Sequence, residues 1–359
     1  MDTKVLELLV CPECKEDLQL EILRDDRSSQ VIDGILACEG CGRAYPVIDG
    51  IPRLLPDEMN GNLLSYHREF FERHGSRFPS IAHKADKSGK TVLKERTLKS
   101  FSFQWNTFGK IYLEYGLHWQ DYLPVSVEKS ALLEGKLGLD AGCGFGRHAL
   151  QAAAAGAQMI GMDLSEAVKA AYSNTRHLKN VHIIQGDIYN PPFRRGTFDF
   201  IYSLGVLHHL PDPDGGFRSL AGLLRQGQEM FIWCYDNEKP KKNSLYEFIR
   251  RYSSRLNYKA LYAFTFLAAS GVRLSLNYPV MLAKAFGAKD KKFPYDYYTK
   301  YPFGVLHADL FDVFSVPSTR YYNLGQLEEW FAQSGMEVLE GRHCVSGWTV
   351  YGKKRSADE

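Results

Sequence analysis

Four of the seven cysteines in this chain stand in two closely spaced pairs near its beginning. Cys11 and Cys14 belong to "CPEC", and Cys38 and Cys41 belong to "CEGC". Two cysteine pairs with this spacing, each in a tight turn, can place four thiolates around one tetrahedral zinc ion, at Zn–S distances of about 2.3 Å. A redox-active dithiol is the alternative for one pair, but two pairs in so short a segment favour a metal. Because four sulfur ligands leave no open position, we expect this zinc site to be structural.

A second chemical signal is the glycine-rich segment "LDAGCGFGRH", where an acidic residue ends an apolar run. In the dinucleotide-binding fingerprint G-x-G-x-x-G, a helix N-terminus holds a pyrophosphate. Here Arg147 stands three positions after Gly144, and the third glycine comes one residue early. Asp140 would repel a pyrophosphate, but it could pair with an ammonium group. A ligand that joins an amino acid to a nucleoside without phosphate fits better, and S-adenosylmethionine is such a ligand.

The elements that must position this loop form an alternating series of strands and helices. "QMIGMDLS" is predicted as a strand ending in Asp163, whose carboxylate can accept both ribose hydroxyls, and "VHIIQGDI" ends in Asp187, which suits an adenine amino group. "FDFIYSLGVLHHLPDP" and "EMFIWCY" supply two further strands. The alternation predicts an α/β fold with a doubly wound parallel sheet and a ligand at the carboxyl ends of its strands. The alternative is that both aspartates are only solvated strand-end carboxylates.

These motifs together resemble the class I S-adenosylmethionine-dependent methyltransferases over about residues 128–236, and "FAQSGMEVL" with "SGWTVYGKK" looks like the final helix and strand pair of that family. The resemblance implies a Rossmann-like core and S-adenosylmethionine as cofactor. It also implies a set of cofactor contacts: Asp140, Gly142 and Gly144 at the methionine end, Asp163 at the ribose, Asp187 with Ile188 at the adenine, and Leu164 and Ser203 in the same site.

The N-terminal segment resembles a second, smaller family. "LELLVCPECKEDLQL" and "GILACEGCGRAYPVIDGIPRLLP" are similar to the zinc-ribbon proteins whose free-standing members bind and activate tRNA- and ribosome-modifying methyltransferases. The resemblance covers about residues 3–56. It implies that the ribbon accompanies a methyltransferase, in agreement with the larger domain.

The order of these motifs predicts five consecutive segments. An aromatic stretch ahead of the first core strand, "FSFQWNTFGKIYLEYGLHWQDYL", offers Phe103, Gln104 and Trp105 as candidates to line the cofactor site, with plain packing as the alternative. After the fifth strand a long insertion, first basic and then apolar and aromatic, is expected to be the substrate lid. The predicted segments are a zinc ribbon (1–56), a linker and helical cofactor cap (57–127), the cofactor-binding core (128–236), the lid (237–317) and the final helix and strand pair (318–359).

Methyl transfer needs a general base only when the acceptor is a hydroxyl or a carbon acid. The candidates follow strands four and five or lie in the returning lid, and each has packing or capping as its alternative role. They are His208, His209, Asp236, His307 and Asp312, with Asp309 and Tyr322 beside them.

Composition narrows the class of function only in part. The formal net charge of +2 gives no global argument for nucleic acid binding, and the N-terminus lacks the features of a signal peptide, so a cytoplasmic protein is expected. The preferred hypothesis is methyl transfer to a small-molecule or lipid-like metabolite, with membrane-surface contact through the lid as a further possibility. An RNA methyltransferase is the alternative, and a non-catalytic cofactor-binding partner protein is a third reading.

Overall fold

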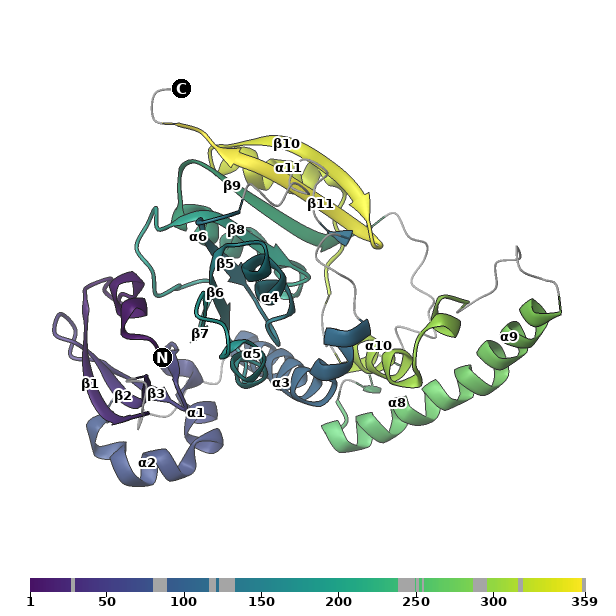
Figure 1. Ribbon diagram of the computed structural model, residues 1–359, viewed down its shortest axis with the longest axis horizontal. Helices are drawn as coiled ribbons and strands as arrows, with labels where there is room; N and C mark the ends of the chain where they lie inside the picture. The colour runs from purple at the N-terminus through teal and green to yellow at the C-terminus, as the bar shows by residue number, and fades with distance from the viewer. Residues whose placement is uncertain are drawn as a thin grey trace.

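The computed structural model describes most of the chain and shows a single mixed sheet that runs through the predicted zinc ribbon and the predicted cofactor-binding core (Figure 1). Its strand order is β1-β2-β3-β4-β7-β6-β5-β8-β9-β11-β10. The described residues are 1–26, 30–79, 89–115, 121–122, 133–237, 249, 252–253, 255–286, 296–315 and 319–356.

The N-terminal ribbon contributes one edge of this sheet. Its strands are antiparallel to one another, but its last strand turns to pair in parallel with the core, with Arg53 opposite Gln185. The ribbon and the core are therefore joined by backbone hydrogen bonds as well as by side chains. The elements are η1 (Thr3–Leu8), β1 (Leu18–Asp25), β2 (Val31–Cys38), β3 (Ala44–Ile48) and β4 (Ile51–Leu54).

The core confirms the predicted fold class. Five strands run parallel, and the hairpin at the far edge adds the antiparallel strand β11, so the sheet is mixed. The strands are β5 (Leu137–Ala141), β6 (Gln158–Asp163), β7 (Val181–Gly186), β8 (Phe198–Leu204), β9 (Leu224–Tyr235), β10 (Met336–Cys344) and β11 (Gly347–Lys354).

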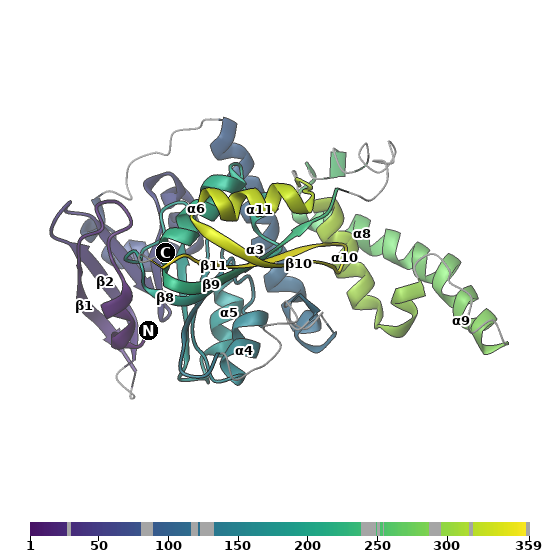
Figure 2. The ribbon, with the colours of Figure 1, turned by 90° about the horizontal axis from the view of Figure 1, so that it is seen from above.

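Helices cover both faces of the core sheet (Figure 2). Ile201 packs on one face, while its neighbours Phe200 and Tyr202 pack on the other. Strands buried on both faces must be apolar at successive positions, which explains the continuous apolar runs in the sequence. The covering helices are α4 (Arg147–Ala154) and α5 (Val168–Thr175) on one face, and α6 (Pro213–Leu223) and α11 (Leu324–Gln333) on the other.

Three helices form a cap beside the core. Phe108, Leu261 and Phe311, one from each helix, meet in a buried cluster. The second cap helix continues through a π-helical turn into another helix, and together they project from the body as an arm (Figures 1 and 2). The cap helices are α3 (Gly89–Tyr115), α8 (Tyr258–Val272) and α10 (Phe303–Ser315), and the arm continues as η9 (Arg273–Asn277) and α9 (Tyr278–Ala285), with η10 (Asp296–Lys300) beside it.

Part of the segment predicted as a linker has regular structure instead. Residues 57–79 form short helices whose Phe70, Phe71 and Phe78 pack together and join the ribbon residues Ile35 and Ile48 in one buried cluster. These elements are η2 (Asp57–Met59), α1 (Asn60–Tyr66), α2 (Arg68–His74) and η3 (Gly75–Arg77). Among the described residues, no helix combines the length and the apolar character needed to cross a bilayer.

Candidate functional site

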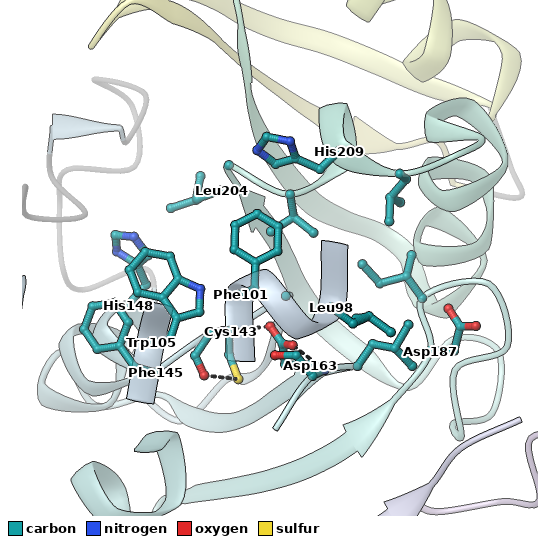
Figure 3. A pocket seen from close by; sticks show the side chains of 18 of the residues that line it. Leu98, Phe101, Trp105, Cys143, Phe145, His148, Asp163, Asp187, Leu204 and His209 are labelled. Atoms are coloured by element: carbon teal, nitrogen blue, oxygen red, sulfur yellow. Dashed lines mark hydrogen bonds between the residues drawn. The ribbon is translucent and has the colours of Figure 1, made fainter. Parts of the chain in front are cut away.

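A pocket lies where the parallel strands β5 to β8 reach their carboxyl ends (Figure 3). Loops from four strands line it, because the carboxyl ends of parallel strands meet at one edge of the sheet. Helix α3 supplies a further wall. The lining residues from the loops include Gly142, Gly144, Asp163, Leu164, Asp187 and Ile188.

The glycine loop after β5 requires glycine for conformational and steric reasons. Gly142 has a φ of +88°, and a Cβ atom at this position would lie 2.4 Å from a methyl carbon of Val206. The Gly142 amide donates to the carbonyl of Met162, at 2.7 Å, which holds the loop against β6. A side chain here would push the loop and its neighbour apart, and the backbone would no longer line the pocket.

Asp163 connects the glycine loop to the end of β6. Its Oδ2 accepts a hydrogen bond from the Gly144 amide at 3.0 Å, and its Oδ1 accepts one from the Ser165 amide at 2.8 Å. Burial raises the pKa of Asp163, and the hydrogen bonds from Ser165 and Gly144 oppose that shift. A carboxylate offers about four acceptor sites, so the group can still accept a hydrogen bond from a ligand hydroxyl in the pocket.

Asp187 directly follows β7 on the same side of the sheet. Its Oδ1 accepts a hydrogen bond from the Tyr189 amide at 3.1 Å, which fixes the turn after the strand. The pocket thus carries two carboxylates on neighbouring strands, Asp163 and Asp187, as Figure 3 shows. Two acceptors at separate positions suit a nucleoside, which presents ribose hydroxyls at one point and a base amino group at another.

Two of the predicted cofactor contacts lie outside the set of residues that line the pocket. Asp140 is buried beneath the glycine loop, where burial raises its pKa to about 7, opposed by a hydrogen bond from the Tyr202 hydroxyl. Ser203 is fully buried, and its hydroxyl donates to the carbonyl of Ala141 at 2.9 Å. Both residues support the loop from below, so the predicted direct contact of Asp140 and Ser203 with the cofactor stays a prediction.

Helix α3 closes the pocket with an aromatic wall. Phe101 and Trp105 line it together with Leu98, and the Trp105 ring lies 4.9 Å from the ring of Phe145 in the glycine loop. Of the three predicted candidates in this helix, Trp105 alone is among the lining residues. Phe103 stacks on Tyr258 and Phe311 inside the cap, and Gln104 is fully buried.

Sequence reasoning missed Leu98 and Phe101 as lining residues. Positions 98, 101 and 105 follow the i, i+3, i+7 spacing of one helical face, which is the signal that could have found them. This signal has meaning only if the segment is helical from residue 98 onward. The prediction of a linker and helical cofactor cap over residues 57–127 did not say where the helix begins, whereas α3 begins at Gly89.

Of the predicted bases, His209 alone is among the residues that line the pocket. Its ring lies edge-on to Phe101, with ring centres 5.4 Å apart, and its Nδ1 is 3.4 Å from the hydroxyl of Thr319. The neighbouring His208 is buried, and burial holds its pKa well below the ordinary histidine value. His208 packs against Tyr235 at 4.4 Å between ring centres, as a neutral core residue would.

The other candidate bases contact protein groups away from this pocket. His307 on α10 is buried, with its Nε2 3.1 Å from the Thr265 hydroxyl and 3.2 Å from the Tyr262 carbonyl. Asp309 accepts hydrogen bonds from the hydroxyls of Tyr112 on α3 and Tyr298 in η10, at 2.6 and 2.9 Å. Three candidates remain. The Asp236 carboxylate contacts His343, and the backbone of Asp236 forms an isolated parallel β-bridge with Tyr322, the second candidate. The third, Asp312, lies on α10.

The described part of the predicted lid packs beside the pocket and does not line it. No described residue between 249 and 315 is among those that line it. Helices α8 and α10 instead pack on α3, which carries the aromatic wall. The prediction that the insertion covers the acceptor stays a prediction; Phe264, Phe266 and Leu267, its apolar residues on α8, are 37%, 43% and 70% exposed.

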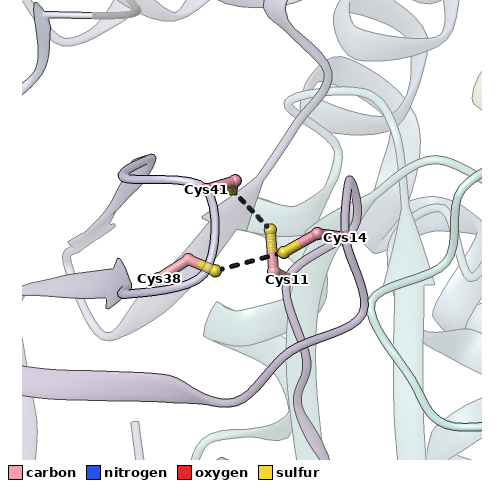
Figure 4. Close-up of side chains that lie close together, drawn as sticks. All are labelled: Cys11, Cys14, Cys38 and Cys41. Carbon is pink, nitrogen blue, oxygen red and sulfur yellow. Dashed lines mark hydrogen bonds between the residues drawn. The ribbon is translucent and has the colours of Figure 1, made fainter.

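The predicted cluster of four cysteines is confirmed in the ribbon (Figure 4). The Cys11 and Cys41 sulfurs are 3.6 Å apart, those of Cys14 and Cys38 are 3.3 Å apart, and all four lie within 4.8 Å of one another. Four sulfurs at Zn–S bonds of about 2.3 Å in a tetrahedron are about 3.8 Å apart. The residues therefore fit a structural zinc ion with four thiolate ligands.

A buried ion-pair network joins the ribbon to the loop beside Asp163. Arg53 on β4 is fully buried, and its Nη1 donates to both carboxylate oxygens of Glu166, at 3.1 and 3.2 Å, and to Gln185 at 2.7 Å. His67 and Lys169 also contact the Glu166 carboxylate. Although burial opposes ionisation, the His67 hydrogen bond and the positive charge of Arg53 hold the pKa of Glu166 far below its ordinary value.

Comparison with known proteins gives two matches to families. Residues 139–232 match the family described as "Methyltransferase domain", and residues 2–50 match the family described as "Trm112p-like protein". A UPF0434 protein from Maricaulis maris is 50% identical over 58 residues, which are 16% of this chain and 78% of that protein.

Curated relatives of the core carry two different names. A tRNA U34 carboxymethyltransferase from Psychromonas ingrahamii is 33% identical over 99 residues, 26% of this chain and 30% of that protein. A ubiquinone biosynthesis O-methyltransferase from Marinobacter nauticus is 30% identical over 128 residues, 32% of this chain and 50% of that protein. The chain thus spans at most half the length of these two relatives.

Proposed function

We propose that this chain, which belongs to the class I S-adenosylmethionine-dependent methyltransferases and carries a Trm112p-like zinc ribbon, transfers a methyl group to a small-molecule or lipid-like acceptor. The observation that carries the proposal is the pocket itself. It combines a glycine loop, two carboxylates on neighbouring strands and an aromatic wall from α3. The same residues fit the parts of S-adenosylmethionine that need recognition.

Each part of the pocket has a role in this proposal. The backbone of Gly142 and Gly144 faces the methionine end, Asp163 accepts hydrogen bonds from the ribose, and Asp187 accepts one from the adenine. When bound, S-adenosylmethionine supplies a methyl group that is already activated on a sulfonium. The protein then has to position the acceptor in line and exclude water. Phe101 and Trp105 provide an apolar wall that excludes water.

The chemistry of the pocket supports an apolar or aromatic acceptor. Phe101 and Trp105 from α3 present apolar surface together with Leu204 at the end of β8 and Val206 after it. Among the described residues, His209 and His148 are the two histidines that line the same pocket. A hydroxyl acceptor must lose its proton as the new bond forms, and we assign His209 to receive it. An acceptor without such a proton would need no base, and His209 would then only shape the wall.

Methylation of RNA is the second candidate. It is supported by the tRNA-modifying relatives and by the Trm112p-like segment. The basic start of the insertion contains four cations that could contact RNA phosphates, and all four lie outside the described residues: Lys241, Lys242, Arg250 and Arg251. The apolar wall favours the first candidate, because a pocket that receives a nucleotide must also satisfy its phosphate charges.

Labelled S-adenosylmethionine and a cell extract as acceptor pool would test the proposal. After incubation with the purified protein, the label is followed into the organic-soluble, small-molecule, RNA and protein fractions. We expect label in the organic-soluble or small-molecule fraction, and we expect Asp163→Ala to abolish it. Label in the RNA fraction would establish the second candidate instead. A protein that binds S-adenosylmethionine in calorimetry but labels no fraction would support the third reading, a non-catalytic partner protein.

A further inference from the structure

The arm formed by α8, η9 and α9 presents an unusual amount of apolar side chain to solvent. Leu267 is 70% exposed, Leu274 66%, Leu282 60% and Phe286 84%. These residues lie along the arm from the cap to its far end, where it projects from the body (Figure 2). Single exposed leucines are common on proteins, but a row of them along one element indicates a surface that binds a partner molecule or a membrane.

The exposed apolar residues share one face of the arm. Phe264, Leu267, Leu274 and Leu282 follow one another at about helical spacing, whereas the buried positions Leu261, Thr265, Ala269, Asn277 and Val280 form the opposite face. That buried face packs on α10 along α8 and on η10 along η9 and α9, which leaves the apolar face outward. The three elements have fifteen, five and eight residues, so this face extends over about 40 Å.

The charge of the same region is of one sign. From Phe248 through Lys289, both included, the sequence contains seven lysines and arginines and no aspartate or glutamate. The chain as a whole has 44 basic and 42 acidic residues, so the local imbalance does not reflect overall composition. Arg255 and Lys259, at the cap end of the arm, are exposed to solvent.

A shallow apolar hollow extends the face at the cap end. Ile249, Tyr252, Leu256 and Phe264 line it with Ser253. Arg255 lies over the Tyr252 ring, 5.9 Å from its centre, and therefore stands at the rim of the hollow. Apolar surface and cations thus alternate within a few residues of one another.

We propose that the arm docks the protein onto the surface of an anionic lipid bilayer. The exposed leucines and Phe286 enter the boundary between head groups and acyl chains, and the cations contact the lipid phosphates. An apolar face flanked by cations and free of acidic residues is the pattern of helices that lie in the membrane interface. An RNA partner would account for the cations but would leave the apolar face exposed. This inference does not depend on which acceptor is methylated.

Vesicle binding by the full-length protein tests the proposal. Co-sedimentation is measured with vesicles of phosphatidylcholine and phosphatidylglycerol, and with phosphatidylcholine alone. We expect binding to the mixed vesicles that weakens as salt is added. The triple variant Leu267→Ser, Leu274→Ser, Leu282→Ser should lose about a thousandfold in affinity, at about tenfold for each leucine removed. The double variant Arg255→Gln, Lys259→Gln should lose about fivefold for each charge, with the anionic vesicles only.

A matched control separates loss of the arm's surface from a general loss of apolar side chains. Ile22, Leu64 and Leu339 are 50%, 37% and 47% exposed at other places on the molecule, so their triple replacement by serine should leave vesicle binding unchanged. S-adenosylmethionine binding, measured by calorimetry, should be the same in every variant, since the pocket lies apart from these residues. That readout shows the variants to be folded, and it is independent of methyl transfer.

Three outcomes would overturn the proposal. The first is equal vesicle binding by the arm variant and the control variant. The second is a dimer in sedimentation that the leucine variant abolishes without lipid, because a second copy of the chain would then cover the face. The third is RNA binding that the Arg255→Gln, Lys259→Gln variant loses and the leucine variant keeps, with no binding to vesicles.

Discussion

Removal of the Arg53 side chain should weaken the junction between the ribbon and the core. In Arg53→Met the flexible apolar side chain fills a similar space, but the Glu166 carboxylate loses one of its cationic contacts while it stays buried. His67 and Lys169 remain beside it. The substitution therefore measures how much one buried charge contributes to the free energy of unfolding at the point where β4 joins β7.

The structure supports an estimate of this loss. Removing one partner of a buried ion pair typically costs about 3–5 kcal/mol, because the other charge is left without compensation. We expect the lower end, about 3 kcal/mol, since Glu166 keeps two contacts and since Nε and Nη2 of Arg53 find no hydrogen-bond partner among the described residues. For a chain of this size the melting temperature should fall by about 6 °C.

Thermal unfolding of the full-length protein measures the effect, and an exposed pair provides the control. Arg77 and Glu21 also form an ion pair, with side chains that are 51% and 49% exposed, and Arg77→Met should leave the melting temperature nearly unchanged because solvent screens this pair. The double variant Arg53→Met, Glu166→Leu should be more stable than Arg53→Met alone, because no uncompensated charge remains. Equal losses in Arg53→Met and Arg77→Met would refute the reasoning.

The pH dependence of the network has a defined sign. The folded-state pKa of Glu166 lies below its ordinary value of 4.5, so the folded state binds this proton less readily than the unfolded state does. The contribution of Glu166 to the free energy of unfolding is therefore fully present above pH 4.5 and is lost as the pH falls below 4.5. The difference in stability between the wild type and Glu166→Gln should therefore shrink as the pH is lowered through 4.5, and a difference that grows would contradict the assignment.

Further predictions concern the metal and the cofactor. The purified protein should hold one zinc per chain by elemental analysis, and Cys38→Ser should release it and unfold the ribbon. Asp163→Ala removes a ligand acceptor and the anchor of the glycine loop, and it should weaken S-adenosylmethionine binding by about a hundredfold, or about 2–3 kcal/mol, in calorimetry. Asp17→Asn, at an exposed carboxylate of the ribbon, should leave that affinity unchanged. Gly142→Ala places a methyl group against Val206 at a positive φ, and the same titration should show loss of binding.

The sequence was sufficient to predict the parts of this protein that depend on local spacing. The two cysteine pairs predicted the four-sulfur cluster, because each pair lies in one tight turn. The alternation of apolar strands and helices predicted the core, and the acidic residues at the strand ends predicted Asp163 and Asp187 at one edge of the sheet. In each case the relevant contacts lie within a few residues, or follow from the rule that parallel strands end together.

The tertiary structure decided everything that depends on contacts between distant segments. The pairing of Arg53 on β4 with Gln185 on β7 joins residues more than one hundred positions apart, and no local pattern encodes the partner of an edge strand. The aromatic wall of α3 and the placement of α8 and α10 behind it likewise depend on packing between helices. Side-chain periodicity shows which face of an element is apolar, but only the folded chain determines which other surface covers that face.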